Sequence, residues 1–399
     1  MLTKTRQNLI AQIRGYFANG TTAMSDAVFT NPVAAYASSA RLQLEKQTLF
    51  RDYPILMAMS CQLANPGDYL TEDFSGTPLL LVRQKNGDLS GFINACAHRG
   101  APVAQGTGTR GSGFTCPYHA WGYELNGRLR NIPGEEGFNS IDRNDYGLKP
   151  IPVIEKYGMV WAIPNPAKNA APVDIDIDID IDTYLGDLAP EYASYEFSGY
   201  HHFATQILEP KINWKMGVDG FLESYHLSVL HPKTVSPLYF SNRSTADGFG
   251  LNHRMVAVRK SFAKANDDAE LERDFLLHTN ILYTLFPNTM FVYQRDHLEI
   301  WRMFPDGDDP SRSKMVLSMY TPEPVTSESA QRHWENNLRL ALDTVEAEDL
   351  MLGEKIQRGY QSGAQAFVTY GRNEPALAHF HASLDKALSV KDKIEIKQG

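Results

Sequence analysis

Short apolar runs separated by turn residues dominate the chain between residues 48 and 163. The run Thr77–Arg83 is followed by the turn Lys85–Asp88 and by a second run, Leu89–Asn94. Residues Tyr123–Leu129 repeat this arrangement around another Asn-Gly pair. Asn-Gly between two apolar runs is a strong signal for a β-hairpin. The pattern therefore predicts a small antiparallel, all-β domain over residues 48–163.

The remainder of the chain mixes two periodicities. The segments Thr289–Met303 and Lys314–Thr321 are typical of strands, whereas Glu328–Ser362 has the spacing of a long helix. Such a mixture predicts an α+β domain, which we place at residues 183–399. The first 47 residues begin with an amphipathic segment. We expect this part to be helical and to pack on the second domain.

The long helical segment contains an apolar stripe with one acidic residue in it. Its members fall at steps of 4, 3, 4, 3 and 4, as on one face of an α-helix: Leu338, Leu342, Val345, Asp349, Leu352 and Ile356. Glu346 and Glu348 lie off this stripe. A carboxylate buried without a partner is strongly unfavourable. We therefore expect Asp349 to bind a metal ion or, alternatively, to pair with a nearby Arg or Lys.

Aspartate and isoleucine alternate from Asp174 to Asp182. Alternation usually indicates a half-buried strand, but aspartates two residues apart repel each other and Asp is a poor strand residue. Prolines at positions 164, 166 and 172 precede the repeat. We interpret residues 164–182 as a linker between two domains. A calcium site is the alternative, and no EF-hand-like spacing supports it.

Length and charge narrow the classes of protein. A chain of 399 residues fits about two domains. The net charge of −9 includes the five aspartates of the repeat, and no basic tract is present, so we expect no nucleic-acid partner. No apolar stretch approaches the roughly 20 residues of a membrane span. The N-terminus lacks the apolar core of a signal peptide. These features favour a cytoplasmic protein that does not bind membranes.

Two short motifs, Cys-x-His and Cys-x-x-His, carry the most informative chemistry. They supply Cys96 and His98, then Cys116 and His119. Two thiolates and two imidazoles are the ligand set of a Rieske [2Fe–2S] centre, in which the cysteines hold one iron and the histidines hold the other. A structural zinc site is the alternative. Zinc fingers, however, usually pair Cys with Cys and place the His pair on a helix, which Pro117 disfavours here.

The third cysteine, Cys61, lies in a hydrophobic run far from these motifs. It is most simply a buried apolar residue. One unpaired thiol without a disulfide framework indicates a reducing compartment.

A second candidate metal site follows in the spacing Glu223, His226 and His231. Two histidines and one carboxylate on one side of Fe(II) form the facial triad of non-haem oxygenases and leave positions for O2. Glu223 and His226 are three residues apart and would share a helix face. Pro232 disfavours α geometry at His231, so we expect the helix to end there. The alternative is that both histidines are structural.

From about Phe50 to Leu384 the chain resembles the large (α) subunit of a Rieske non-haem iron oxygenase of the aromatic ring-hydroxylating type. The segments that carry the resemblance are Asn94–Gly100, Cys116–Trp121, Asn213–Pro232 and Glu348–Gly359. The resemblance implies a Rieske [2Fe–2S] domain followed by a START-like, helix-grip catalytic domain with an antiparallel sheet and helices.

The resemblance also implies a role for each candidate residue. Cys96, His98, Cys116 and His119 match the cluster ligands, and His226, His231 and Asp349 match the ligands of a mononuclear Fe(II). Glu223 matches a bridging acid that carries electrons between subunits. Two positions depart from the commoner family pattern, since Glu223 replaces Asp and Ala120 replaces Gly. Glu223 and the Glu-Asp…Gln-Arg-Gly run are similar to the branch that oxidises quaternary amines.

In this family the α subunit is the terminal oxygenase, fed with NAD(P)H electrons by a ferredoxin or flavin reductase. The sequence lacks a GxGxxG fingerprint of its own. The resemblance implies a homotrimer, with or without a small β subunit, and O2 as co-substrate. We expect the protein to hydroxylate or dihydroxylate a small aromatic compound.

Three alternatives stay open. The same machinery could oxidise or dealkylate a quaternary amine or another methylated substrate. From different classes, the chain could be a Rieske electron-transfer protein whose C-terminal domain binds a ligand without iron, or a zinc-stabilised binding module.

Overall fold

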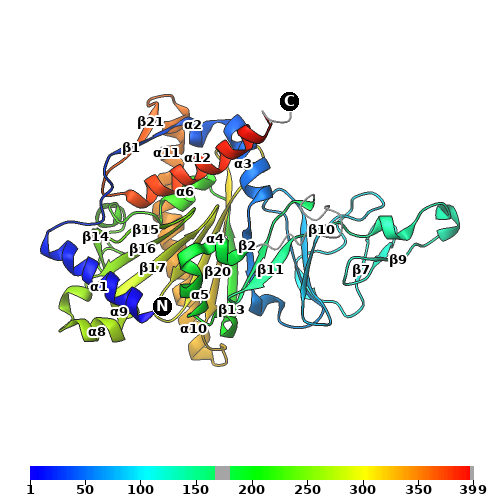
Figure 1. Ribbon diagram of the computed structural model, residues 1–399, viewed down its shortest axis with the longest axis horizontal. Coiled ribbons are helices and arrows are strands. Elements are labelled where there is room, and N and C mark those ends of the chain that lie inside the picture. Colours follow the sequence, from blue (N-terminus) through cyan, green and yellow to red (C-terminus); the bar gives the residue numbers. More distant parts are fainter. Residues whose placement is uncertain (167–179, 396–399) are drawn as a thin grey trace. The chain divides into compact units, whose positions relative to one another are not determined.

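The structure is a computed structural model that describes residues 1–166 and 180–395, and the chain divides into two compact units. The β unit comprises Lys46–Ile181 and Phe197–Gly199. The α+β unit comprises Met1–Glu45, Asp182–Glu196 and Tyr200–Gly399. Figure 1 shows short strands in the first unit and one large sheet with helices in the second. The α+β fold class predicted from the sequence is confirmed.

Most of the predicted linker lies outside the described residues. The gap at 167–179 contains the greater part of the Asp-Ile repeat, so neither the linker nor the calcium site can be compared with the structure. At the C-terminal end of the predicted linker, helix α4 (Ile181–Leu185) already begins, and α5 (Ala189–Ala193) follows it.

Three small antiparallel sheets build the β unit. A five-stranded sheet has the order β10-β5-β4-β3-β6, with strands β3 (Asp68–Glu72), β4 (Leu79–Arg83), β5 (Leu89–Ile93), β6 (Thr107–Thr109) and β10 (Pro150–Ile151). Two three-stranded sheets have the orders β11-β12-β2 and β7-β8-β9, with strands β2 (Ile55–Met59), β11 (Val153–Lys156), β12 (Met159–Ala162), β7 (Phe114–Thr115), β8 (Gly122–Tyr123) and β9 (Leu129–Asn131).

Both predicted Asn-Gly hairpins are confirmed. Gly87 connects β4 to β5 with φ of 93°, and Gly127 connects β8 to β9 with φ of 80°. Residues other than glycine rarely adopt such angles. At Gly127 a second constraint applies, since an added Cβ would lie 2.5 Å from the ring of Phe92. The turn therefore packs directly on the core of the unit.

One antiparallel sheet of eight strands forms the centre of the α+β unit. Its order is β13-β20-β19-β18-β17-β16-β14, and β15 pairs with β16 outside this path. The strands are β13 (His201–Leu208), β14 (Tyr239–Ser244), β15 (Asp247–Phe249), β16 (Asn252–Arg259), β17 (Thr279–Leu285), β18 (Thr289–Tyr293), β19 (Leu298–Pro305) and β20 (Ser313–Thr321). The strands predicted within 289–303 and 314–321 are confirmed.

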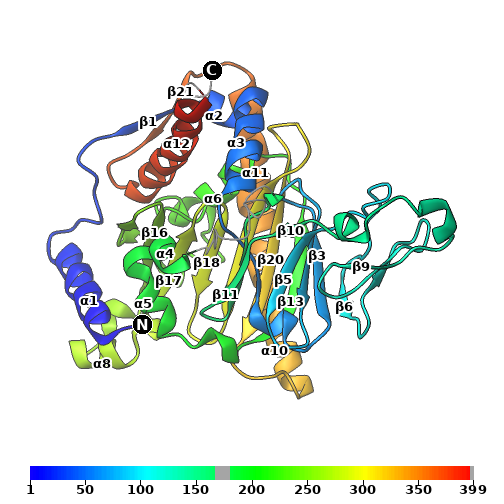
Figure 2. The ribbon, with the colours of Figure 1, turned by 45° about the vertical axis from the view of Figure 1, so that its right-hand side comes forward.

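Helices cover this sheet and account for the burial of its central strands. On one face Tyr192 of α5 packs against Tyr283 of β17, with ring centroids 5.1 Å apart. Elsewhere α6 (Trp214–Asp219) packs on β19 and β20, and α12 (Pro375–Glu395) packs on β15 and β16 (Figures 1 and 2). Shorter helices are α7 (Leu227–Leu230), α8 (Asp268–Arg273) and α9 (Phe275–His278).

The N-terminal residues belong to this unit through pairing and packing. Strand β1 (Phe29–Pro32) pairs with β21 (Phe367–Tyr370), near the C-terminal end of the chain. Helix α1 (Thr3–Ala18) packs on α8. Two further helices, α2 (Ala34–Ala37) and α3 (Ser39–Asp52), follow β1.

The predicted long helix is present, but its phase changes in the middle. Helices α10 (Glu328–Thr344) and α11 (Met351–Gln361) are joined by a π-helical turn, Val345–Leu350. A π turn bonds i to i+5 and so inserts one residue into the α-helical repeat. The predicted stripe is therefore not one continuous core-facing row, because from the end of the turn the buried positions are Leu350, Gly353 and Gln357. Leu352 and Ile356 are exposed and line an open cavity together with Val345 and Asp349.

Across the described part of the chain, no helix combines the length and the apolar character that crossing a bilayer requires.

A buried ion pair connects α3 with α6. Lys215 Nζ lies 2.7 Å from both carboxylate oxygens of Glu45, and both side chains are completely buried. Trp214 Nε1 and Arg41 Nε donate to the same carboxylate at 2.9 and 3.0 Å. Burial lowers the pKa of Lys215, and Glu45 opposes this by stabilising the ammonium form. The pair fixes the helix that leads into the predicted iron-binding segment.

Replacing Glu45 by alanine leaves Lys215 buried without its partner. Because an uncompensated buried charge is very unfavourable, we expect Glu45→Ala to lower the free energy of unfolding by about 3–5 kcal/mol. Urea unfolding followed by circular dichroism measures the change. The control Glu328→Ala removes the exposed partner of Arg332 and should leave the midpoint unchanged. Equal midpoints for both variants would show that the buried pair does not stabilise the unit.

Candidate functional site

The four predicted cluster ligands lie on two loops of the β unit. Cys96 and His98 follow β5, and Cys116 and His119 follow β7. Backbone hydrogen bonds close both loops, from Cys96 N to Ala101 O and from Cys116 N to Trp121 O, each 2.8 Å long. Both thiols are buried and free of disulfides, and the two imidazole rings lie 4.7 Å apart. The structure therefore brings two thiols and two imidazoles together.

The surroundings of these side chains fit a metal cluster. The buried Nδ1 atom of His98 has no hydrogen-bond partner among the described residues. Such an atom is unfavourable unless it binds a ligand. Burial and the neighbouring His119 lower the pKa of His98, which favours the neutral imidazole that metals bind.

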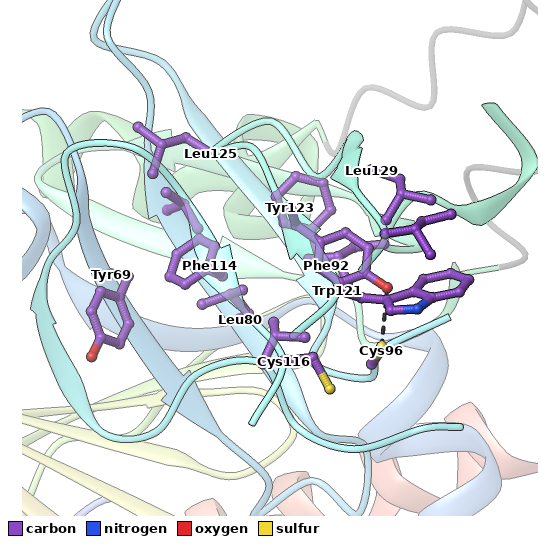
Figure 3. Close-up of a cluster of buried hydrophobic side chains, with 14 residues drawn as sticks. Tyr69, Leu80, Phe92, Cys96, Phe114, Cys116, Trp121, Tyr123, Leu125 and Leu129 are labelled. Atoms are coloured by element: carbon purple, nitrogen blue, oxygen red, sulfur yellow. Dashed lines mark hydrogen bonds between the residues drawn. The ribbon is translucent and has the colours of Figure 1, made fainter. Parts of the chain in front are cut away.

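Side chains below the loops hold the cysteines in place. Trp121 stacks on the His98 ring, with centroids 4.9 Å apart. The Tyr123 hydroxyl lies 3.2 Å from Cys96 Sγ (Figure 3). The Tyr123 hydroxyl also accepts the N–H of Ala97 at 2.9 Å. Hydrogen bonds to the sulfur ligands are one means by which proteins tune cluster potentials.

Ala120 occupies a position where the backbone is left-handed and where the family pattern more often has glycine. Its φ is 57°, and its N–H donates to Cys116 O at 3.0 Å to close the turn. A residue with a Cβ loses about 1–2 kcal/mol in this conformation.

The second predicted site is assembled in the α+β unit. His226 and His231 flank the four-residue helix α7 as its N-cap and C-cap, and Asp349 lies in the π-helical turn. Asp349 Oδ1 lies 3.1 Å from His231 Nε2 and 3.8 Å from His226 Nε2. One ligand atom from each residue lies within 4.8 Å of the others, so the three side chains could hold a metal ion.

The local prediction around these histidines is correct in one part and wrong in another. The helix ends at His231, as Pro232 led us to expect. Glu223 and His226, however, do not share a helix face, because residues 221–226 form turns between α6 and α7. Glu223 accepts the backbone N–H groups of Tyr225 and His226 instead. This turn brings the Glu223 carboxylate onto His226 Nδ1.

Sequence reasoning missed Glu348, which holds the second imidazole. Glu348 Oε2 lies 2.6 Å from His231 Nδ1 and accepts the Thr234 hydroxyl at 2.7 Å. α-Helical periodicity places Glu348 away from the site, and the extra residue of the π turn brings it in. Only a signal for that turn could have revealed Glu348 in advance.

Both histidines thus share one arrangement. Each has a carboxylate at Nδ1 and directs Nε2 toward Asp349. A carboxylate at one ring nitrogen fixes the tautomer and orientation of a ligating imidazole. Although burial opposes it, the hydrogen bonds that the His231 ring donates to Asp349 and Glu348 raise the pKa of His231. A bound metal would replace the proton at Nε2.

A cavity of about 710 Å³ opens onto these three side chains. Its volume is within the range of small-molecule sites. The wall includes five aromatic residues, Phe221, Tyr239, Trp301, Tyr360 and Tyr370. The metal-binding geometry therefore faces a chamber large enough for a small organic substrate.

Comparison with protein families agrees with this division of the chain. Residues 54–149 match the family described as Rieske [2Fe-2S] domain, and residues 197–390 match the catalytic domain of the ring hydroxylating alpha subunit. Together the two matches include the loops of the β unit and the three side chains at the cavity.

Individual relatives cover most of the chain. The carnitine monooxygenase oxygenase subunit of Escherichia coli K12 is 27% identical over 369 residues, which are 88% of this chain and 92% of the relative. The glycine betaine monooxygenase oxygenase subunit of Chromohalobacter salexigens is 28% identical over 382 residues, 86% of this chain and 81% of the relative. A crystal structure of a quaternary ammonium Rieske monooxygenase with L-carnitine shares the fold, with a TM-score of 0.75, 21% identity and coverage of 95% and 97%.

Removing Glu348 should weaken metal binding without removing a ligand. Loss of a carboxylate behind a ligating histidine typically costs about 10–100-fold in metal affinity. We expect Glu348→Ala to lose that much affinity for Fe(II), measured by competition with a chelator followed by iron analysis. Glu346→Ala, two residues away and exposed, is the matched control and should keep its iron. Equal iron retention in both variants would exclude a supporting role for Glu348.

Proposed function

The chain belongs to the Rieske non-haem iron oxygenases, and on that basis we propose that it is the terminal oxygenase of a system that oxidises a quaternary ammonium compound. From the sequence, an aromatic substrate was the main expectation and a quaternary amine the alternative. The relatives named for carnitine and glycine betaine support the alternative. They do not support an aromatic substrate or a dioxygenase. The observation that carries the proposal is the aromatic cavity beside His226, His231 and Asp349.

The wall of the cavity suits a methylated cation. A quaternary ammonium group cannot donate hydrogen bonds, so it is bound by ring faces and by carboxylates. Phe221 and Trp301 lie 5.5 Å apart at an angle of 47°, and Tyr360 and Tyr370 contribute further ring surface. The carboxylate of Asp219 is also part of the wall.

Each metal group has side chains that fit it. Cys96, His98, Cys116 and His119 would hold the [2Fe–2S] cluster, and His226, His231 and Asp349 would hold the iron. When bound, the cluster supplies single electrons and the iron activates O2. The protein itself fixes both imidazoles through Glu223 and Glu348, and its apolar wall limits water near the substrate.

We further propose a separate electron donor and a ring of subunits. A ferredoxin or a flavin reductase would supply the electrons. In a homotrimer, Glu223 would connect His226 of one subunit to a cluster histidine of its neighbour. Its side chain is 12% exposed and already holds His226, so it is suited to this position.

A substrate panel tests the function directly. We expect the iron- and cluster-loaded protein, with a reductase and O2, to convert a quaternary amine such as L-carnitine or glycine betaine. Mass spectrometry should detect either the demethylated amine with formaldehyde or trimethylamine from C–N cleavage. Product must be measured, because NADH consumption alone includes uncoupled turnover. Oxidation of naphthalene or indole in the absence of any quaternary amine product would contradict the proposal.

Glu223→Gln tests the proposed link between subunits. We expect both metal contents and the paramagnetic signal of the reduced cluster to be retained, while product formation falls by about 10–100-fold or more. The control is Glu374→Gln, a nearby acid whose carboxylate accepts the backbone N–H of Gly371, a hydrogen bond that a glutamine side-chain oxygen can also accept. Normal turnover in Glu223→Gln would remove this residue from the electron path.

A further inference from the structure

The cavity wall changes from apolar to polar along the strands. Alternate residues of a strand face the same side, and Met255, Ala257 and Arg259 of β16 all line the cavity. Met255 pairs with Leu282 of β17, whereas Ala257 pairs with Asn280. The wall is therefore apolar at the pair Met255–Leu282 and becomes polar at Asn280, which pairs with Ala257. Arg259, the last residue of β16, lies at the polar end.

Arg259 has very few partners for a guanidinium at a cavity wall. Its Nε atom is buried and has no hydrogen-bond partner within residues 1–166 and 180–395. Its Nη2 atom makes one long contact, 3.4 Å, with Gln294 Oε1. The group lies over the ring of Tyr239, 5.1 Å from its centroid. A guanidinium has five N–H donors, and the only hydrogen-bond partners of the Arg259 side chain among the described residues are Gln294 and the Tyr239 hydroxyl, so part of its donor capacity is unused.

The nearby carboxylate that could neutralise Arg259 is already occupied. Glu299 is fully buried, and it accepts hydrogen bonds from Gln294 at 2.7 Å and Trp301 at 2.9 Å. His297 Nε2 lies 3.1 Å from the same carboxylate, and the ring also contacts Asp296 at 2.8 Å. Although burial opposes it, these two acids raise the pKa of His297 to about 9.

The charges at this end of the cavity leave an excess of positive charge. His297 lies between two carboxylates, Glu299 and Asp296. Arg259 is a half-buried cation that forms no ion pair within the described residues, and Arg295 at the rim adds a further positive charge. An anionic group of the ligand would restore the balance.

We infer that Arg259 binds a carboxylate of the substrate, so that the substrate class is a quaternary ammonium compound that also carries a carboxylate. The inference rests on the proposed function and narrows it. A carboxylate can accept two parallel N–H groups of one guanidinium, which is the strongest pairing available to arginine. A substrate without this group would leave the guanidinium, whose Nε is buried, without an anionic partner, and such sites reject ligands that lack the matching group.

Matched pairs of ligands test the inference by binding. Glycine betaine and choline differ in one end group, which is a carboxylate in the first and a hydroxymethyl group in the second. L-carnitine and its carboxamide differ in the charge of the corresponding group, which is a carboxylate in the acid and a neutral amide in the carboxamide. Calorimetry on the loaded enzyme without O2 measures each Kd. We expect the acid of at least one pair to bind about 30-fold or more tightly than its neutral counterpart, the effect of one charge-assisted contact.

Variants assign that preference to a residue. Arg259→Met should weaken binding of the acid by about 30-fold and change binding of the neutral ligand by less than about 3-fold. Arg259→Lys should keep part of the preference, because lysine keeps the positive charge but cannot donate two parallel N–H groups to one carboxylate. Lys260→Met is the matched control, since Lys260 is the next residue and is exposed away from the cavity, and it should retain the full preference.

The remaining outcomes distinguish failure of the carboxylate site from failure of the proposed function. If the wild-type enzyme binds acid and neutral ligands equally, or if Arg259→Met weakens both equally, the carboxylate site is refuted and the proposed function stands. If the wild-type enzyme binds no quaternary ammonium ligand, the proposed function fails and the inference fails with it. The wild-type comparison needs no variant, so a misfolded Arg259→Met would not prevent the test.

Discussion

One additional residue in a helix determines the geometry at the candidate iron site. In an uninterrupted α-helix, neighbouring side chains point roughly 100° apart, and the predicted stripe places Asp349 inward and Glu348 off the site. Both residues lie in the π-helical turn Val345–Leu350, where the inserted residue changes the phase of the helix. Glu348 then contacts Nδ1 of His231, and Asp349 contacts Nε2 of the same imidazole. The ring is held at both edges and cannot rotate without losing one of two hydrogen bonds.

The two histidines are held in place by contacts of very different range. His226 is positioned locally, by an acid three residues before it, whereas the acid that holds His231 lies 117 residues further along the chain. The segment between α6 and α7 is supported in turn by the buried pair of Lys215 and Glu45. The site therefore forms completely only when α3, α6 and the π-helical turn have packed in one unit.

Much of the architecture was predictable, because it depends on local signals. Asn-Gly turns marked both hairpins, and Pro232 marked the end of α7. The Cys-x-His and Cys-x-x-His motifs indicated a cluster site because they supply two thiols and two imidazoles, the ligand set of a Rieske centre. The candidate ligands could be named for the same reason, with Asp349 found from helical periodicity and family resemblance.

The missing parts are those that no local pattern encodes. Glu348 was assigned to the wrong side because periodicity assumes a constant residue count per turn, which the π turn changes. The proposed role of Arg259 depends on its lack of an ion-pair partner in the folded unit, and a sequence does not show which contacts a side chain lacks. The expectation of an aromatic substrate has a related origin: the cavity wall combines residues from seven strands and several helices, and a single sequence does not bring them together.

The pairing of β1 with β21 imposes an order on biosynthesis. The β unit is almost contiguous, so a ribosome releases nearly all of it as one block, and domains commonly fold as they emerge. Phe29–Pro32 is made before the β unit, and its partner Phe367–Tyr370 is made after it. The earlier segment must therefore remain unpaired while the whole β unit is synthesised. A nascent chain halted anywhere before residue 367 would carry an open strand edge, which makes early termination a route to aggregation.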